Sequence, residues 1–178
     1  AALVGLAFPR LLFGPEHRYG TSAGGTESSL KGLGVAALKT YHRSHYRPDN
    51  AVLIVVGDTT TAALRPLVEA RFGAWKAEGP AVPPFPVRVS PQPGKRQIFL
   101  VDKPGAAQSQ IRIGLVGVPR STADYIALYV LNTILCGSFT SRLNQNLRED
   151  KGYTYGARSA FDMRAAAGPF LAAAGVQT

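Results

Sequence analysis

Arg148 and Tyr155 carry side chains that are suited to gripping a peptide carbonyl group. The guanidinium of an arginine offers five donors in a fixed fork, and a phenol offers one directional donor. A structural role is the alternative, in which Arg148 caps helix carbonyls and pairs with Glu149 or Asp150 while Tyr155 is half-buried in the core. Spacing alone favours the structural alternative, so the choice depends on the elements that position the two residues.

The run from Ser138 to Gly156 predicts a helix, a turn and a strand, in that order. Its first part is helical because apolar residues recur at every fourth position and so form one stripe. Either Ser138 or Thr140 can cap the start of this helix by accepting a hydrogen bond from an unpaired backbone N–H. The stripe consists of Phe139, Leu143 and Leu147.

Gly152 ends the predicted helix, because glycine takes the left-handed conformation after a helix at little cost. The Tyr153-Thr154-Tyr155 triplet then changes the pattern to a period of two, which predicts that a strand begins there. We therefore expect Arg148 on the last turn of a helix and Tyr155 just inside a strand.

The stretch LRED-KG-Y-T-Y resembles the second-domain signature of the pitrilysin/insulinase family of zinc metallopeptidases, which includes the mitochondrial processing peptidases. In that family an Arg and a Tyr seven residues later reach from the second domain into the active site of the first, where they hold the substrate backbone and help to stabilise the tetrahedral intermediate. Arg148 and Tyr155 have this separation, and the preceding G-S-F-T-S-R-L run is similar too. The resemblance implies that both residues bind substrate and take part in catalysis.

A second block of the chain resembles the same family independently of the Arg and Tyr. The sequence Y-R-P-D-N-A-V-L-I-V-V-G-D…F-G-A-W, residues 46–75, is similar to the last helix–strand–helix portion of a first family domain. Residues 51–58 form a continuous β-branched run, which predicts a fully buried strand. Helices are predicted over residues 28–46 and from the hydroxyl caps at 59–61 to Phe72.

Residues 77–94 hold six prolines and predict an extended, semi-rigid linker. The resemblance assigns residues 1–76 to the C-terminal half of a first family domain and residues 95–178 to the N-terminal half of a second, which carries the Arg/Tyr motif. In this second half, the patterns predict a helix over 124–135 and strands over 96–104, 108–117, 154–163 and 168–178.

These elements predict an α+β fold in which helices pack on a mainly antiparallel sheet. The resemblance implies the same arrangement, the two-layer domain of the family. The two halves contain a full set of domain parts in permuted order. We expect the halves to join, either within one chain or by exchange between chains, with residues 51–57 as one of the shared strands.

The chain has no H-x-x-E-H sequence, so the zinc ligands that the family uses would lie upstream of Ala1. His17 lies in a Gly- and Ser-rich connector that resembles the family's H-P-Y-G segment, with Arg18 in place of Pro, and is interpreted as a surface loop residue. His42 and His45 are three residues apart without a Glu between them, so we assign them to a solvated helix face. We expect no metal ligand in this chain.

Composition narrows the class of protein. The 178 residues carry a net charge of +9, but the basic residues are scattered and are not interleaved with aromatic residues, so we expect no nucleic-acid binding. No apolar run is long enough for a membrane span.

Cys136, the single cysteine, lies in an apolar helix as a small core residue. An apolar start without a basic leader and an end inside the strand-like LAAAGVQT suggest a piece of a longer protein.

The sequence predicts part of a zinc-dependent endopeptidase that contributes substrate-binding groups and not the metal, so that this segment alone is inactive. Its partners would be a peptide or protein substrate and a zinc-bearing domain or partner subunit, in a homo- or heterodimer. A non-catalytic structural subunit of the same family is the alternative. The compartment, periplasm or cytoplasm, stays open, because no targeting segment is visible.

Overall fold

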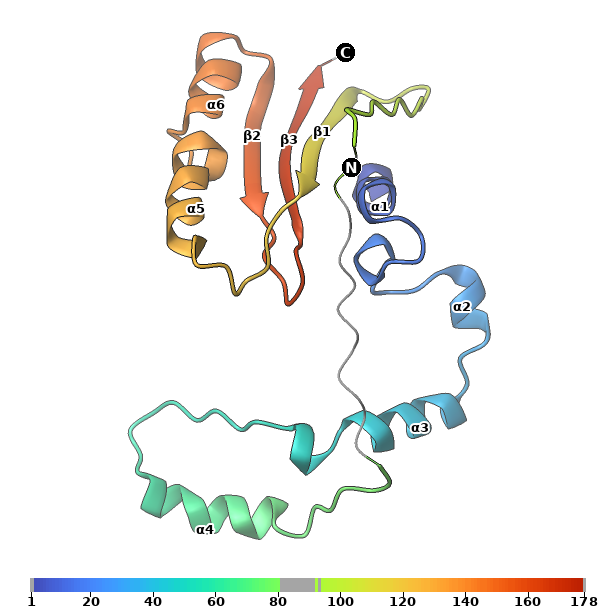
Figure 1. Cartoon of the computed structure of the whole chain (residues 1–178), viewed down its shortest axis with the longest axis vertical. Helices are drawn as coiled ribbons and strands as arrows, with labels where there is room; N and C mark the ends of the chain where they lie inside the picture. The colour runs from blue at the N-terminus through green and yellow to red at the C-terminus, as the bar shows by residue number, and fades with distance from the viewer. Residues whose placement is uncertain (1, 81–91, 93, 178) are drawn as a thin grey trace. The chain divides into compact units, whose positions relative to one another are not determined.

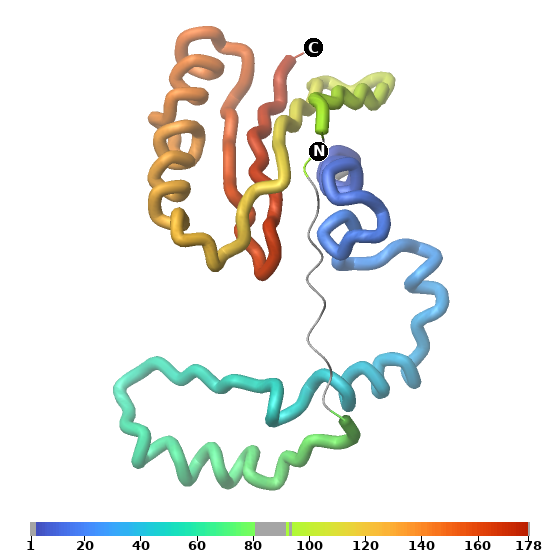
Figure 2. Tube along the Cα trace, viewed as in Figure 1, coloured from blue at the N-terminus to red at the C-terminus, as the bar shows by residue number. Residues whose placement is uncertain are grey.

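The structure is a computed structural model, and it describes residues 2–80, 92 and 94–177 (Figure 1). The chain divides into two units. A sheet unit combines residues 1–24 with 86–178, and a helical unit comprises residues 25–85. Figure 2 follows the chain through both units as a tube. Arg148 and Tyr155 belong to the sheet unit.

A three-stranded antiparallel sheet forms the centre of the sheet unit. Its strands are β1 (Gln108–Val116), β2 (Thr154–Phe161) and β3 (Pro169–Gln177), in the spatial order β1-β3-β2. All three strands were expected at these positions, and these predictions are confirmed. The α+β prediction is confirmed as well, because helices accompany the antiparallel sheet.

One face of this sheet is covered by helical segments that precede β2 in the chain (Figure 1). The cover is fixed by a reciprocal pair of hydrogen bonds. The Asn132 amide donates to the Ser159 carbonyl at 3.0 Å, and the Ser159 hydroxyl donates to the Asn132 side-chain oxygen at 2.7 Å. Cys136 is 3% exposed between helix and sheet, as expected for a core residue. These segments are α5 (Tyr125–Asn132), η3 (Thr133–Gly137), α6 (Arg142–Asn144) and η4 (Gln145–Asp150).

The opposite face of the sheet is covered in part by α1 (Ala2–Phe13). A Cβ added to Gly114 of β1 would lie 2.6 Å from the ring of Phe8, so the glycine allows the helix to approach the strand. The short η1 (Arg18–Gly20) follows α1, and the Tyr19 hydroxyl there accepts a hydrogen bond from the backbone N–H of Ala166 at 3.1 Å. The N-terminal residues therefore form a real part of the sheet unit.

The helical unit contains α2 (Glu27–Lys31), α3 (Val35–His45), η2 (Pro48–Asn50) and α4 (Thr61–Phe72), close to the predicted helices. Arg47 joins the segment after α3 to the segment after α4, because its guanidinium donates to the carbonyls of Glu78 and Gly79 at 2.7 and 2.9 Å. The same guanidinium pairs with Asp49. This hydrogen bond raises the pKa of Arg47 and lowers the pKa of Asp49, so the pair stays charged.

Two predicted strands are wrong in this structure. Residues 51–58 and 96–104 run without strand pairing among the described residues, and the side chains of the first segment are exposed, with Val52 at 87% and Val56 at 93%. The apolar pattern specifies an extended chain, but a strand also needs a neighbour to pair with its backbone. The joining of two half-domains through residues 51–57 therefore stays a prediction.

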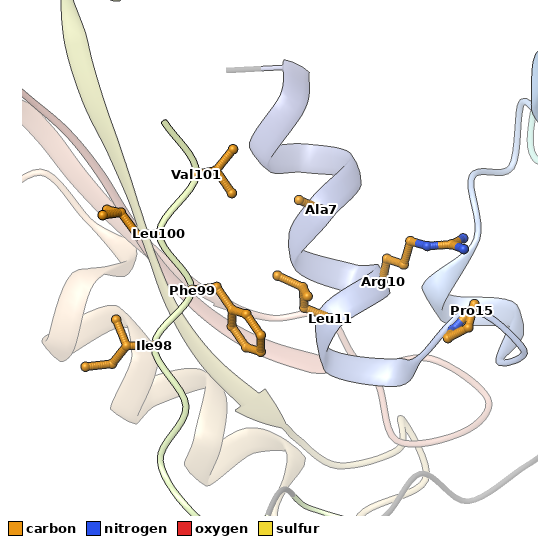
Figure 3. A pocket seen from close by; sticks show the side chains of 8 residues that line it. All are labelled: Ala7, Arg10, Leu11, Pro15, Ile98, Phe99, Leu100 and Val101. Carbon is orange, nitrogen blue, oxygen red and sulfur yellow. The ribbon is translucent and has the colours of Figure 1, made fainter. Parts of the chain in front are cut away.

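The second unpaired segment lies beside α1 and forms one wall of an open groove of about 570 Å³ (Figure 3). Phe99 and Val101 point toward the helix, while Ile98 and Leu100 point away from it. Ile98 and Leu100 are 88% and 96% exposed. The side chains of this segment therefore alternate between the groove and the side away from α1, as in an extended chain.

The stretch Tyr125–Asp150 is long and apolar enough, by length and composition alone, to cross a membrane. Its helical path is interrupted between Gly137 and Arg142, and Asn132 within it bonds to β2. Hydrogen bonds from a helix to a strand are typical of a helix that covers a sheet. The expectation of no membrane span in this chain stays a prediction.

Candidate substrate-binding site

Arg148 lies on η4, at the end of the helical segment that begins at Arg142. Ser141 is the residue before this helix and makes no side-chain cap, so the predicted caps at Ser138 and Thr140 are wrong. Ser138 ends the preceding helix in an extended conformation, with φ −133° and ψ 165°, and its hydroxyl donates back to the Thr133 carbonyl. The helix therefore starts later than the apolar stripe suggested.

The end of the helix follows the prediction. Gly152 has a φ of +63°, in the left-handed region that glycine occupies without strain. Its N–H donates to the Arg148 carbonyl at 3.0 Å, and the N–H of Tyr153 donates to the Leu147 carbonyl at 2.9 Å. These two bonds satisfy carbonyls that the helix end leaves open and turn the chain directly into β2.

A β-bulge interrupts β2 at Tyr155, and the sequence pattern gave no sign of it. Thr154 pairs with Val176 and Ala157 pairs with Ala174, so Tyr155 and Gly156 together stand opposite the single residue Gly175. Such a bulge bends the strand and changes which way the following side chains face. Tyr155 thus occupies an irregular position in the strand.

Two buried polar side chains hold this bulge. The Thr154 hydroxyl donates to the Gly175 carbonyl at 2.6 Å and accepts from the Gly156 N–H at 3.2 Å. The Asn144 side-chain oxygen accepts from the Ala157 N–H at 2.8 Å. The bulge is therefore fixed from both the sheet and the helix, and the position of Tyr155 is fixed with it.

The guanidinium of Arg148 lies close to two aromatic rings. Its central carbon is 4.4 Å from the ring centroid of Phe139 and 4.8 Å from that of Tyr155. Its Nε forms an ion pair with Glu149 at 3.2 Å. The Arg148 side chain is 29% exposed, whereas Tyr155 is 86% exposed. Cation–π contacts of this kind restrict the arginine without consuming its hydrogen-bond donors.

This arrangement contains elements of both alternatives. The ion pair with Glu149 is the structural pairing, but Tyr155 is exposed and does not form part of the core. Within the residues that the structure describes, the terminal nitrogens of Arg148 and the Tyr155 hydroxyl make no hydrogen bond. Chemically, the site offers the donors of the Arg148 guanidinium and of the Tyr155 hydroxyl, and a carbonyl oxygen can accept from either group.

Zinc does not fit the donors in the part of the chain that the structure describes. No group of three or more His, Cys, Asp or Glu residues that could hold a metal ion lies together in the described part of the chain. His42 stacks on Tyr46 and His45 on Tyr41, with centroid distances of 4.9 and 4.0 Å, so each histidine has an aromatic neighbour on its own helix.

His17 differs from its predicted place in a surface loop. It is 9% exposed, it stacks on Phe13 at 5.1 Å, and its Nδ1 accepts from the Tyr19 N–H at 3.0 Å. The connector folds back onto α1 because these rings can bury one another. His17 therefore helps to close the end of α1.

Cys136 is the single thiol, and it lies away from any charged partner in the described residues. Burial raises the pKa of this thiol, and a weaker opposing effect comes from a hydrogen bond with Ser141. A raised pKa keeps the thiol protonated near neutral pH, so Cys136 is unsuited to act as a nucleophile.

Known proteins support the resemblance seen in the sequence. The family model described as "Peptidase M16 inactive domain" matches residues 33–178. A zinc protease of Bacillus subtilis, YmxG, is 32% identical over 139 residues, which cover 78% of this chain and 32% of that protein. A zinc protease of Mycobacterium leprae is 30% identical over 165 residues, covering 93% of this chain and 37% of that protein.

The fold comparison agrees. A crystal structure of a peptidase M16 inactive domain from Pseudomonas fluorescens matches with a TM-score of 0.86 and 30% identity, covering 98% of this chain and 41% of that one. The chain thus spans about a third of the length of the curated relatives it matches. With the family model matching residues 33–178, the chain belongs to the peptidase M16 inactive domain family.

Proposed function

We propose that Arg148 and Tyr155 grip the backbone of a peptide substrate within a zinc-dependent endopeptidase. The observation that carries this proposal is their pairing at an exposed surface: the Arg148 guanidinium lies 4.8 Å from the ring of Tyr155, which is 86% exposed. A tyrosine that served only the core would be buried. A helix end, a glycine turn and a bulge all contribute to this exposed pair.

The two residues have different tasks in this proposal. Arg148, held close to the rings of Phe139 and Tyr155, presents its terminal nitrogens to backbone carbonyls of the substrate. Tyr155 donates its hydroxyl proton in a hydrogen bond to the scissile carbonyl, whose oxygen gains negative charge as the bond is attacked. Donors aimed at such an oxygen stabilise the transition state more than the ground state.

The metal is supplied from elsewhere in this proposal, because the described residues hold no donor set for it. Another domain of the same polypeptide or a partner subunit, in a homo- or heterodimer, would hold zinc. The names of the relatives from B. subtilis and M. leprae, both zinc proteases, support this division of labour. The segment alone is then inactive.

The experiment that tests the proposal uses the full-length protein that the gene encodes. Elemental analysis gives the zinc content, and cleavage of a quenched peptide is followed with and without a chelator in the same preparation. About one zinc per active site, together with chelator-sensitive cleavage, is the expected result. Absence of cleavage in the presence of every partner chain encoded nearby would contradict it.

A structural subunit is the second candidate, and the Arg148–Glu149 ion pair favours it. In that case the Arg and Tyr would stabilise the corner between η4 and β2 and would bind no substrate. The description of the family as an inactive domain fits this role as well. The two candidates differ in the zinc experiment, since a structural subunit gives neither metal nor cleavage.

A further inference from the structure

On the face of the sheet away from α5, one row of paired residues contains two arginines. Ser159 bonds to Asn132 of α5, so its face of β2 is the helix-covered one, and the neighbouring residue Arg158 lies on the other face. Arg158 pairs with Ala173 of β3, and Ala173 pairs with Arg112 of β1. Arg112, Ala173 and Arg158 therefore form one row across the three strands, on the face that α1 covers only in part.

Two guanidiniums flank a small residue in this row. Because neighbouring strands lie about 4.8 Å apart, the Cα atoms of Arg112 and Arg158 are about 10 Å from each other. The β3 residue between them is an alanine, so no long side chain of β3 stands between the two arginines. Arginine side chains are long enough for both guanidiniums to reach a single group placed over Ala173.

Neither arginine has a carboxylate partner among the residues that the structure describes. Elsewhere in the sheet unit, Arg148 pairs with Glu149 and Arg164 pairs with Asp162. Partial burial, followed by the charge of Arg158, lowers the pKa of Arg112, which is the effect of a cation that lacks compensation. An anion between the two would remove this unfavourable charge interaction.

The row lies next to the candidate site. On β3, Ala173 and Gly175 are two residues apart and face the same way, and Gly175 is the residue opposite the bulge that contains Tyr155. A Cβ added to Gly175 would lie 2.7 Å from the side-chain nitrogen of Gln110, so an amide donor lies beside the row. Along β3, the distance from Ala173 to Gly175 is about 7 Å, so the arginine row and the position opposite the bulge are one such step apart.

We propose that Arg112 and Arg158 together bind the carboxylate of an acidic side chain in a polypeptide substrate. This inference rests on the proposed function, because it assigns the substrate class of the same site. An extended polypeptide held at Tyr155 repeats its same-side groups at about 7 Å, which matches the step between the rows. Arginine forks suit a carboxylate because they donate to both oxygens. The net charge of +9 favours the approach of acidic peptides.

Binding of two peptides that differ only in one residue, Glu or Gln, tests the proposal on the full-length protein. We expect the Glu peptide to bind about tenfold more tightly at low salt, which corresponds to about 1.4 kcal/mol. Arg112→Gln and Arg158→Gln should each reduce this preference to about twofold or less. Arg96→Gln removes the same charge from an exposed position outside the strands and should keep the preference.

The outcomes separate this proposal from the one on which it rests. Equal binding of both peptides by the wild-type protein, or a preference that survives in Arg112→Gln, would overturn it. A third outcome would also overturn the proposal: inorganic phosphate binds to the wild type and not to either arginine variant, while the two peptides bind equally. The row would then be a phosphate site. Tyr155→Phe should leave the Glu preference intact even though turnover falls, so a failure of the catalytic proposal is visible separately.

Misfolding of the variants is controlled by a second measurement. Removing one of two like charges should leave the melting temperature of Arg112→Gln at or above that of the wild type. Arg158→Lys keeps the charge but not the fork, so it should fold and retain only part of the preference. A full preference in Arg158→Lys together with none in Arg158→Gln would show that charge alone decides binding, which contradicts the paired-fork geometry.

Discussion

The Asn144 side-chain oxygen accepts a hydrogen bond from the backbone N–H of Ala157 at 2.8 Å, and this bond joins α6 to the bulge in β2. Asn144 is 7% exposed, and its amide nitrogen also donates to the Ser138 carbonyl at 3.0 Å. One side chain therefore links the loop before the helix, the helix itself and the strand that carries Tyr155.

Asn144→Ala should lower the free energy of unfolding by about 1–3 kcal/mol, because it leaves a buried N–H without an acceptor. Denaturant unfolding followed by circular dichroism measures the change. Asn144→Asp is the matched control, since it keeps the acceptor for Ala157 and loses the donor to Ser138. An Ala variant as stable as the wild type would show that the bulge does not depend on this bond.

Gly152→Ala should destabilise the protein by about 1–2 kcal/mol, because a residue with a Cβ is strained in the left-handed conformation. The φ of +63° at this position is the reason. Gly5→Ala is the opposite case: Gly5 lies inside α1, a Cβ there meets nothing within 4 Å, and the better helix former should add up to about 1 kcal/mol. A Gly152→Ala variant as stable as the wild type would contradict the left-handed helix end at this position.

The ranges of the three strands could be predicted from the sequence because local composition and turn residues mark where each strand begins and ends. Gln108–Val116, Thr154–Phe161 and Pro169–Gln177 agree with the expected ranges to within a few residues. Gly152 was predictable too, since the conformation that it adopts depends on one residue. These are features that local steric preferences decide.

The bulge and the unpaired segments depend on distant residues, and periodicity does not contain that information. Tyr155 owes its exposed position to Thr154 and to Asn144. Residues 51–56 have the composition of a central strand, but whether they become one depends on a neighbouring strand. The Arg112–Ala173–Arg158 row likewise appears only once the register of three strands is known.

Cys136 should react slowly with iodoacetamide near neutral pH, because burial raises its pKa and the thiolate is the reactive form. The rate should rise only above the pH range of an ordinary thiol, about 8.5. The unfolded thiol loses its proton first as the pH rises, so stability should also begin to fall above about pH 8.5. Denaturant provides the control, since the unfolded chain should react at the rate of a free thiol; equal rates in both states would contradict the burial argument.

Phe139→Ala should weaken the hold on Arg148, whose guanidinium lies 4.4 Å from the Phe139 ring. Phe139 touches no substrate in this account, so it is a positioning residue. Partly exposed cation–π contacts contribute about 0.5–1 kcal/mol, which corresponds to a two- to fivefold loss in kcat/KM. Phe139→Tyr keeps the ring and should restore the value. A loss that Tyr does not rescue would mean that Phe139 acts through something other than its contact with Arg148.

The proposed function requires that the Tyr155 hydroxyl stabilises the transition state, and Tyr155→Phe in the full-length protein removes only that hydroxyl. Turnover of a quenched peptide should fall by about 10² to 10³, the effect of removing one oxyanion donor, while zinc content stays unchanged. Tyr153→Phe is the matched control, because Tyr153 is also exposed, at 59%, and should retain turnover. Full turnover by Tyr155→Phe would contradict a role of this hydroxyl in catalysis.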